Sequence, residues 1–152
     1  MKTFETVTDV LSNAQQFHNY AENFYLELQA DLADERAKML LGFMAEHEKK
    51  MEDKLMLFSH KSPRHILDTW MQFTVEISPE SFFDDFKNKP NYSVDGISAL
   101  GLKADSYLEG VFQEAGEIAP SADVKEMFKD LASMEDIEKH QLTKAANSLR
   151  DV

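Results

Sequence analysis

The stretch Phe128-Lys-Asp-Leu-Ala-Ser-Met-Glu-Asp-Ile-Glu-Lys-His-Gln-Leu142 decides how the rest of the chain is interpreted. Apolar residues recur in and just after it at helical spacing, at Phe128, Leu131, Met134, Leu142, Ala145 and Leu149. Two acids, Glu135 and Glu138, interrupt this stripe; at about 100° per residue they lie roughly 40° and 20° from Leu131, toward the core. A buried carboxylate is normally paired, protonated or bound to a metal ion. The surroundings of these two acids therefore determine what the interior can do.

The composition predicts a single all-α domain spanning residues 1–152. A chain of 152 residues is long enough to enclose a hydrophobic core. Glycine and proline are scarce, at five and four residues, whereas Leu, Glu, Lys, Ala and Met are abundant. This balance favours helices over strands.

The charge and the absence of cysteine narrow the function classes. The formal net charge of −12 argues against nucleic acid and anionic membranes as partners and suits metal ions, although an acidic surface also serves solubility. Without cysteine, the chain has no disulfide, no thiol catalysis, no zinc–thiolate site, no iron–sulfur cluster and no rubredoxin-type module. It also lacks a long apolar run and a signal-peptide hydrophobic region, which predicts a cytoplasmic protein.

Four long helices are predicted from the hydrophobic periodicity. They run from about Thr3 to Ala30, Asp34 to Phe58, Val94 to Ile118, and from the N-cap Ser121 to about Leu149. Because the loop between the first two is short, these helices are expected to be antiparallel neighbours.

A long connection, residues 59–92, follows the second helix and carries two Ser-Pro pairs that are typical of helix starts. Ser62-Pro63 is predicted to open a helix that continues through Ile66, Leu67, Trp70, Met71 and Phe73. Ser78-Pro79 is predicted to open a short helix through Phe82, Phe83 and Phe86, which Lys89-Pro90-Asn91 ends. We expect this crossover to cover one side of the core. Its aromatic cluster, Phe82-Phe83-Asp84-Asp85-Phe86, is interpreted as crossover packing, or alternatively as a homodimer contact.

An internal repeat relates the two halves at a constant offset of 87 residues. The matched residues are Tyr20 with Tyr107, Glu22 with Glu109, Glu27 with Glu114, Lys38 with Lys125, Ala45 with Ala132, Glu48 with Glu135 and Leu55 with Leu142. Two helical hairpins joined by one long crossover predict a four-helix bundle with pseudo-twofold symmetry.

Each half also carries one copy of a longer pattern. The copies are Ala45-Glu46-His47-Glu48-Lys49-Lys50-Met51 and Ala132-Ser133-Met134-Glu135-Asp136-Ile137-Glu138, with Tyr25 and Phe112 at the aromatic positions, seven residues after His18 and Asp105. On these residues the chain resembles the ferritin-like superfamily, in particular rubrerythrin-like proteins without a rubredoxin domain. In that family each helix pair supplies a Glu from its first helix and a Glu-x-x-His from its second. Here His18 and Asp105 stand where the family has Glu, and Met51 and Glu138 stand where it has His.

The resemblance implies a metal-binding, di-iron type of oxidoreductase. Its ligands would be His18, Glu48, Asp105, Glu135 and Glu138, with Glu48 and Glu135 bridging two ions of Fe or Mn, or serving a single ion. An oxygen-rich set with one nitrogen suits Mn²⁺ or Fe²⁺, and the implied chemistry is oxidation of Fe²⁺ by O₂ or peroxide. No catalytic residue is assigned.

The alternative is a non-catalytic bundle with an interaction or stress-related role. In it, His18 is an imidazolium that bridges Glu48 and Glu135, and Glu138 is protonated or bonded to water. If the acids lack partners, Glu135→Gln is expected to stabilise the metal-free protein.

Several other polar residues are weaker candidates. Glu22 and Glu109 are interpreted as boundary residues, or as ligands of a shifted site. His47 and His140 are predicted at the rim or surface. His60 and His65 are interpreted as solvated loop residues, with metal binding as the alternative.

Overall fold

The computed structural model describes residues 4–72 and 78–150, which are mostly helical. Its elements are β1 (Phe4–Thr6), α1 (Val7–Asp31), α2 (Glu35–Lys61), α3 (Arg64–Leu67), β2 (Trp70–Gln72), α4 (Pro79–Asn88), α5 (Val94–Glu117) and α6 (Ala122–Arg150). The prediction of an all-α protein is confirmed, with one short pair of strands added. Within the described residues, none of the helices combines the length and the apolarity that crossing a membrane requires.

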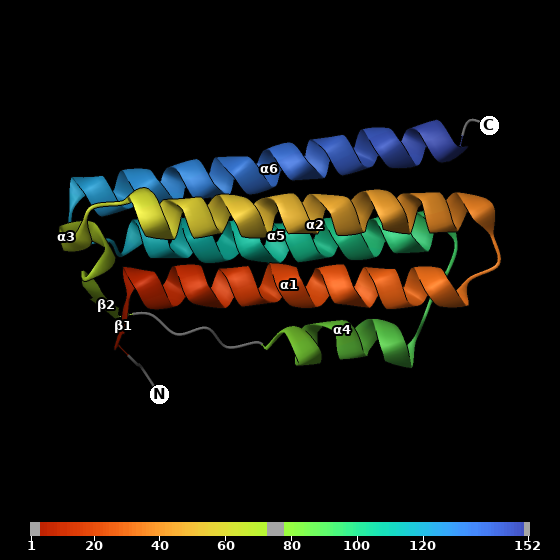
Figure 1. The fold of residues 1–152 in the computed structure, drawn as a ribbon, viewed down its shortest axis with the longest axis horizontal. Coiled ribbons are helices and arrows are strands. Elements are labelled where there is room, and N and C mark those ends of the chain that lie inside the picture. The colour runs from red at the N-terminus through yellow and green to blue at the C-terminus, as the bar shows by residue number, and fades with distance from the viewer. Residues whose placement is uncertain (1–3, 73–77, 151–152) are drawn as a thin grey trace.

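The long helices pair as two hairpins. Helix α1 packs along α2, and α5 packs along α6, while α2 also contacts both α5 and α6. Figure 1 shows α1, α2, α5 and α6 running side by side, with the turns between paired helices at the ends of the molecule. The interior between them holds the buried residues of all four helices.

Local capping determines where the helices begin. The Thr6 hydroxyl accepts a hydrogen bond from the Asp9 N–H, and the Thr6 N–H donates to the Asp9 carboxylate, so α1 begins at Val7. The predicted start, Thr3, lies outside the described residues, but the prediction was too early, because Phe4–Thr6 forms strand β1. The Ser78 hydroxyl caps α4 at the Ser81 N–H, with Pro79 in the first turn, as predicted. The predicted N-cap Ser121 likewise accepts a hydrogen bond from the Val124 N–H at 3.3 Å.

The helix predicted from Ser62-Pro63 through Trp70 and Met71 is wrong beyond its first turn. Helix α3 ends at Leu67, and Trp70–Gln72 instead pairs antiparallel with Phe4–Thr6. Trp70 and Gln72 are exposed while Met71 is buried, which is the alternation of a strand. In such a short apolar segment, the sequence alone does not distinguish the helical period from the alternation of a strand. The predicted end of that helix, Phe73, lies outside the described residues.

Helix α4 covers one side of the core, as predicted for the crossover. Phe83 is fully buried, and its ring centroid lies 4.7 Å from that of Phe24 and 5.9 Å from that of Tyr25. The Phe82 ring meets Phe17 edge-on at 5.4 Å. Figure 1 shows α4 alongside α1, on the side away from α6. The aromatic cluster therefore packs against α1, and the homodimer contact stays an untested alternative.

Candidate functional site

All five predicted ligand residues are buried between the long helices. They are His18 on α1, Glu48 on α2, Asp105 on α5, and Glu135 and Glu138 on α6, each with at most 7% of its surface exposed. Acids are seldom so deeply buried without a partner. The helical periodicity had placed Glu48, Glu135 and Glu138 inward correctly. His18 is fully buried as well.

His18 links two carboxylates. Its Nδ1 contacts Glu48 Oε2, and its Nε2 lies 2.8 Å from Glu135 Oε1. Burial by itself lowers the pKa of His18, but the charges and hydrogen bonds of Glu135 and Glu48 outweigh it and raise the pKa well above its usual value. Both ring nitrogens can donate only in the imidazolium form. His18 therefore joins α1 to α2 and α6 as a buried cation, the arrangement described above for a metal-free interior.

Glu138 has an imidazole partner that the sequence interpretation missed. His47 Nδ1 on α2 contacts Glu138 Oε2 on α6, so the carboxylate is bonded to an imidazole rather than only protonated or hydrated as in the metal-free alternative. The His47 side chain is 18% exposed, and its ring centroid lies 4.1 Å from that of Phe43. Its assignment to the rim was correct, but its contact with the interior was not anticipated.

Burial raises the pKa of two of the carboxyl groups, Asp105 and Glu135. Burial raises the pKa of Asp105 well above its usual value, and the nearby charges of Glu48 and Glu135 raise it further. No hydrogen bond to the Asp105 side chain is formed within the described part of the chain. For Glu135, burial raises the pKa by more than the neighbouring His18 lowers it. Burial therefore opposes the charged form of both carboxyl groups.

A small cavity lies beside these groups. Tyr25, His47, Glu48, Asp105 and Glu138 line it, together with five residues without a charged side chain: Phe43, Met44, Met51, Gly101 and Leu142. Its volume of about 10 Å³, measured for the centre of a water-sized sphere, holds about one water molecule. The hydroxyl of Tyr25 and the Oε2 atom of Glu135 are both buried without a hydrogen-bond partner. Polar atoms in this state usually mark a missing water or ion.

The donor atoms suit a divalent cation, but they do not converge on one point. Across residues 4–72 and 78–150, no three His, Asp or Glu side chains are arranged to hold a metal ion together. Instead, the imidazoles bond to the carboxylates. Carboxylates with imidazole are the donors that Mn²⁺ and Fe²⁺ accept. A bound ion would have to open these contacts and release protons.

Glu22 and Glu109, the candidates for a shifted site, do not line this cavity. Glu109 forms an ion pair with Lys139 at 2.9 Å, and Glu22 is half-buried. Burial raises the pKa of Glu22, and the charge of Glu52 adds to the effect. Glu52 is a further buried acid that the sequence interpretation missed, and it accepts a hydrogen bond from Asn19.

Three of the predicted surface histidines are exposed. His140 Nδ1 lies 2.8 Å from the Asp136 carbonyl oxygen. His60 and His65 are both exposed as predicted, but they lie in helices α2 and α3 and not in a loop. His65 lies 3.7 Å from the exposed Asp123, which is a solvated pair. These side chains add nothing to the buried cluster.

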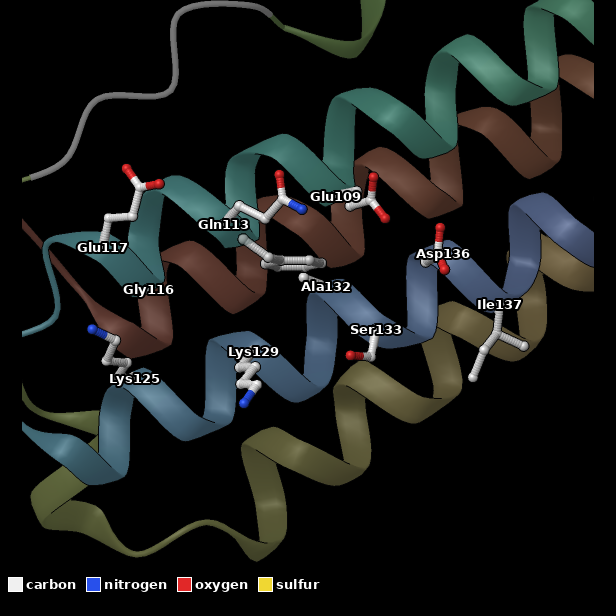
Figure 2. Close-up of a pocket in the computed structure, with 11 residues that line it drawn as sticks. Glu109, Gln113, Gly116, Glu117, Lys125, Lys129, Ala132, Ser133, Asp136 and Ile137 are labelled. Carbon is white, nitrogen blue, oxygen red and sulfur yellow. The ribbon is translucent and has the colours of Figure 1, made fainter.

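A larger groove opens on the outer side of the second hairpin. It has a volume of about 850 Å³ and runs between α5 and α6. Figure 2 shows Glu117 and Lys125 near one end of the groove and Glu109 and Asp136 near the other. None of the five predicted ligands lines this groove. Because both acidic and basic side chains line the groove, its charge does not indicate a particular class of ligand.

Comparison with known proteins bears on the fold alone. No family model matches the chain, and no curated protein matches it. A solved structure from Pyrococcus furiosus, described as a hypothetical protein, is similar with a TM-score of 0.54 and 22% sequence identity. The similarity covers 96% of this chain and 91% of that one. The overall architecture is therefore shared along nearly the whole chain.

Proposed function

We propose that this chain is a ferritin-like, rubrerythrin-like four-helix bundle whose interior binds divalent metal ions, with Fe or Mn as the metal. The two hairpins, the long crossover and the repeat at 87 residues support the fold assignment. One observation carries the functional proposal: His18, Glu48, Asp105, Glu135 and Glu138 lie buried together on four helices.

The charge of the interior supports a cation. Four carboxyl groups are buried with one fully buried imidazole and one half-buried imidazole. Asp105 lacks a hydrogen-bond donor among the described residues, and Glu135 Oε2 is unpartnered. Burying a charged carboxylate costs on the order of several kcal/mol, and an apolar residue at the same position would not incur this cost. A divalent ion would neutralise these groups and occupy their free oxygens.

Glu48 and Glu135 are the residues that would bridge two ions, and His18, Asp105 and Glu138 would bind at the ends. A metal centre of this kind supplies the oxidation of Fe²⁺ by O₂ or peroxide, which is ferroxidase or peroxidase chemistry. Because the chain has no cysteine, electrons would come from Fe²⁺ itself or from a separate reductase. The cytoplasmic location and the homodimer remain predictions.

A second candidate is a metal-free, non-catalytic bundle. It is favoured by the contacts of His18, since both of its ring nitrogens already bond to carboxylates. In this alternative, protons occupy the place of the metal, and the cluster only holds the helices together.

Metal analysis separates the two. The protein, purified without chelators, is analysed for Fe and Mn, and the chelated protein is melted with added Mn²⁺ or, without oxygen, Fe²⁺. At a metal concentration 100 times Kd, binding adds about 2.7 kcal/mol of stability. The matched variants are Glu48→Gln, which should lose the shift, and the exposed Glu46→Gln, which should keep it. If metal is absent and no melt shifts, the metal proposal is contradicted and the second candidate is favoured. If the protein does bind metal, oxygen consumption on addition of Fe²⁺ tests the oxidase activity.

A further inference from the structure

The two imidazoles of the interior differ in the number of hydrogen bonds that hold them and in their exposure to solvent. His18 is fully buried and bonds through both ring nitrogens, to Glu48 and Glu135. His47 bonds only through Nδ1, to Glu138, and no hydrogen bond to its Nε2 is formed within the described residues. Its side chain also reaches solvent. His47 can therefore give up its contact at lower cost than His18.

The cavity lies on the His47 side of the cluster. His47, Glu48, Asp105 and Glu138 line it, whereas His18 and Glu135 do not. A space that holds one water molecule also holds one metal ion, because metal–oxygen distances are shorter than hydrogen bonds. As it stands, the cavity therefore has room for a single ion.

The Tyr25 hydroxyl is an independent sign of a missing polar occupant. Tyr25 is fully buried, its hydroxyl has no partner, and the residue lines the same cavity. An unpartnered buried hydroxyl is costly unless a water or ion satisfies it. Its position beside three carboxyl groups points to a cation or to water bound to one.

We propose that the cavity binds one divalent cation through His47, Glu48, Asp105 and Glu138, while His18 keeps its contacts with Glu48 and Glu135. This inference rests on the proposed function and changes its ligand set, because His47 takes the place of His18 as the nitrogen donor. His47 is the most exposed of the polar residues that line the cavity, with 18% of its side chain exposed against 8% for Glu48 and Glu138. The ion therefore enters past the His47 ring, which turns from Glu138 toward the ion.

The test uses the full chain, stripped of metal, and Mn²⁺ as the probe. Calorimetry measures the number of ions bound and the affinity, and pulsed electron paramagnetic resonance detects a nitrogen bonded to Mn²⁺. The variants are His47→Gln, His18→Gln and the exposed control His140→Gln. The wild type should bind one Mn²⁺ with a nitrogen signal. His47→Gln should lose that signal and weaken binding about tenfold or more, since even the residues supporting a ligand alter affinity 10–100-fold. His140→Gln should match the wild type.

The outcomes distinguish this inference from the proposed function. A wild type that binds no Mn²⁺ defeats both. Binding that survives unchanged in His47→Gln, two ions per chain, or a nitrogen signal that disappears in His18→Gln but not in His47→Gln overturns the His47 site alone.

One further measurement uses only the wild type, so it tests the inference even if a variant fails to fold. In nuclear magnetic resonance of the imidazole nitrogens of the wild type, adding Zn²⁺ as a diamagnetic probe should shift the signals of His47 and leave those of His18 unchanged. The reverse result overturns the inference.

Discussion

The two hairpins repeat each other in sequence, but they contribute different polar side chains to the interior. Helices α1 and α2 supply both imidazoles, His18 and His47, whereas α5 and α6 supply Asp105 and Glu138. Each imidazole bonds to a carboxylate on α6. One contact of each imidazole therefore joins the two hairpins, while the second contact of His18, to Glu48, lies within the first hairpin.

The difference between the halves is clearest at two pairs of matched positions that lie about one helical turn apart. At the offset of 87 residues, His47 corresponds to Met134, and Met51 corresponds to Glu138. The polar residue of each half therefore occupies a position where the other half has methionine. Tyr25 and Phe112 differ in the same way, by one hydroxyl group. Four predictions test what these differences contribute.

The largest effect is expected for Glu135→Leu, which removes one of the two anions around His18. The His18 cation then keeps only Glu48 as a partner, and its Nε2 loses its acceptor; breaking a buried ion pair costs about 3–5 kcal/mol. Urea unfolding of the metal-free protein measures the loss against the exposed control Glu126→Leu on the same helix. Adding His18→Leu should lower the stability further, because the buried Glu48 carboxylate then loses its imidazole partner. A loss below about 1 kcal/mol would show that the pair contributes only as surface pairs do.

Asp105→Asn is expected to stabilise the metal-free protein, and more so at higher pH. Because folding raises the pKa of Asp105, the folded protein binds a proton that the unfolded chain has released. This contribution is complete below the pKa of the unfolded chain and is lost as the pH rises through the folded pKa. The raised pKa of His18 acts in the same direction.

Thermal melts from pH 4 to pH 8 measure this effect. At pH 8 the variant should gain about 1 kcal/mol or more, as one pKa unit corresponds to 1.36 kcal/mol, and at pH 4 the gain should disappear. The exposed control Asp130→Asn should show no such slope. A pH-independent loss of stability would instead mean that the Asp105 carboxyl accepts a hydrogen bond that the asparagine cannot replace.

Tyr25→Phe makes the first half like the second at this position. Removing an unpartnered buried hydroxyl should stabilise the metal-free protein by about 1 kcal/mol. The exposed Tyr92→Phe is the matched control. Destabilisation by Tyr25→Phe would show instead that the hydroxyl is satisfied by a bound water.

The smallest effect is expected for Glu138→Met, which repeats Met51 in the second half. His47 loses its partner but still reaches solvent, so the cost should stay below about 1 kcal/mol. Chemical unfolding beside Glu126→Met measures it. A cost as large as that of Glu135→Leu would mean that the two imidazoles are equally important to the fold.

The helices and most of their ends were predictable because the signals are local. Ser78-Pro79 caps α4 within three residues, and the acids on α6 point inward at angles set by the helix itself. Trp70–Gln72 was not predictable in this way, since its partner strand lies more than 60 residues earlier. The same limit applies to the pairing of His47 with Glu138, which are 91 residues apart.

The sequence by itself determined the helical class, the two related hairpins and the burial of Glu48, Glu135 and Glu138, because helical periodicity alone places a side chain inward or outward. Only the tertiary structure decided which imidazole meets which carboxylate. That choice depends on the rotation and spacing of neighbouring helices, and a small rotation moves a side-chain tip by more than a hydrogen-bond length. His18 is consequently clamped between two acids while His47 remains free to turn, a distinction that no repeat or spacing in the chain encodes.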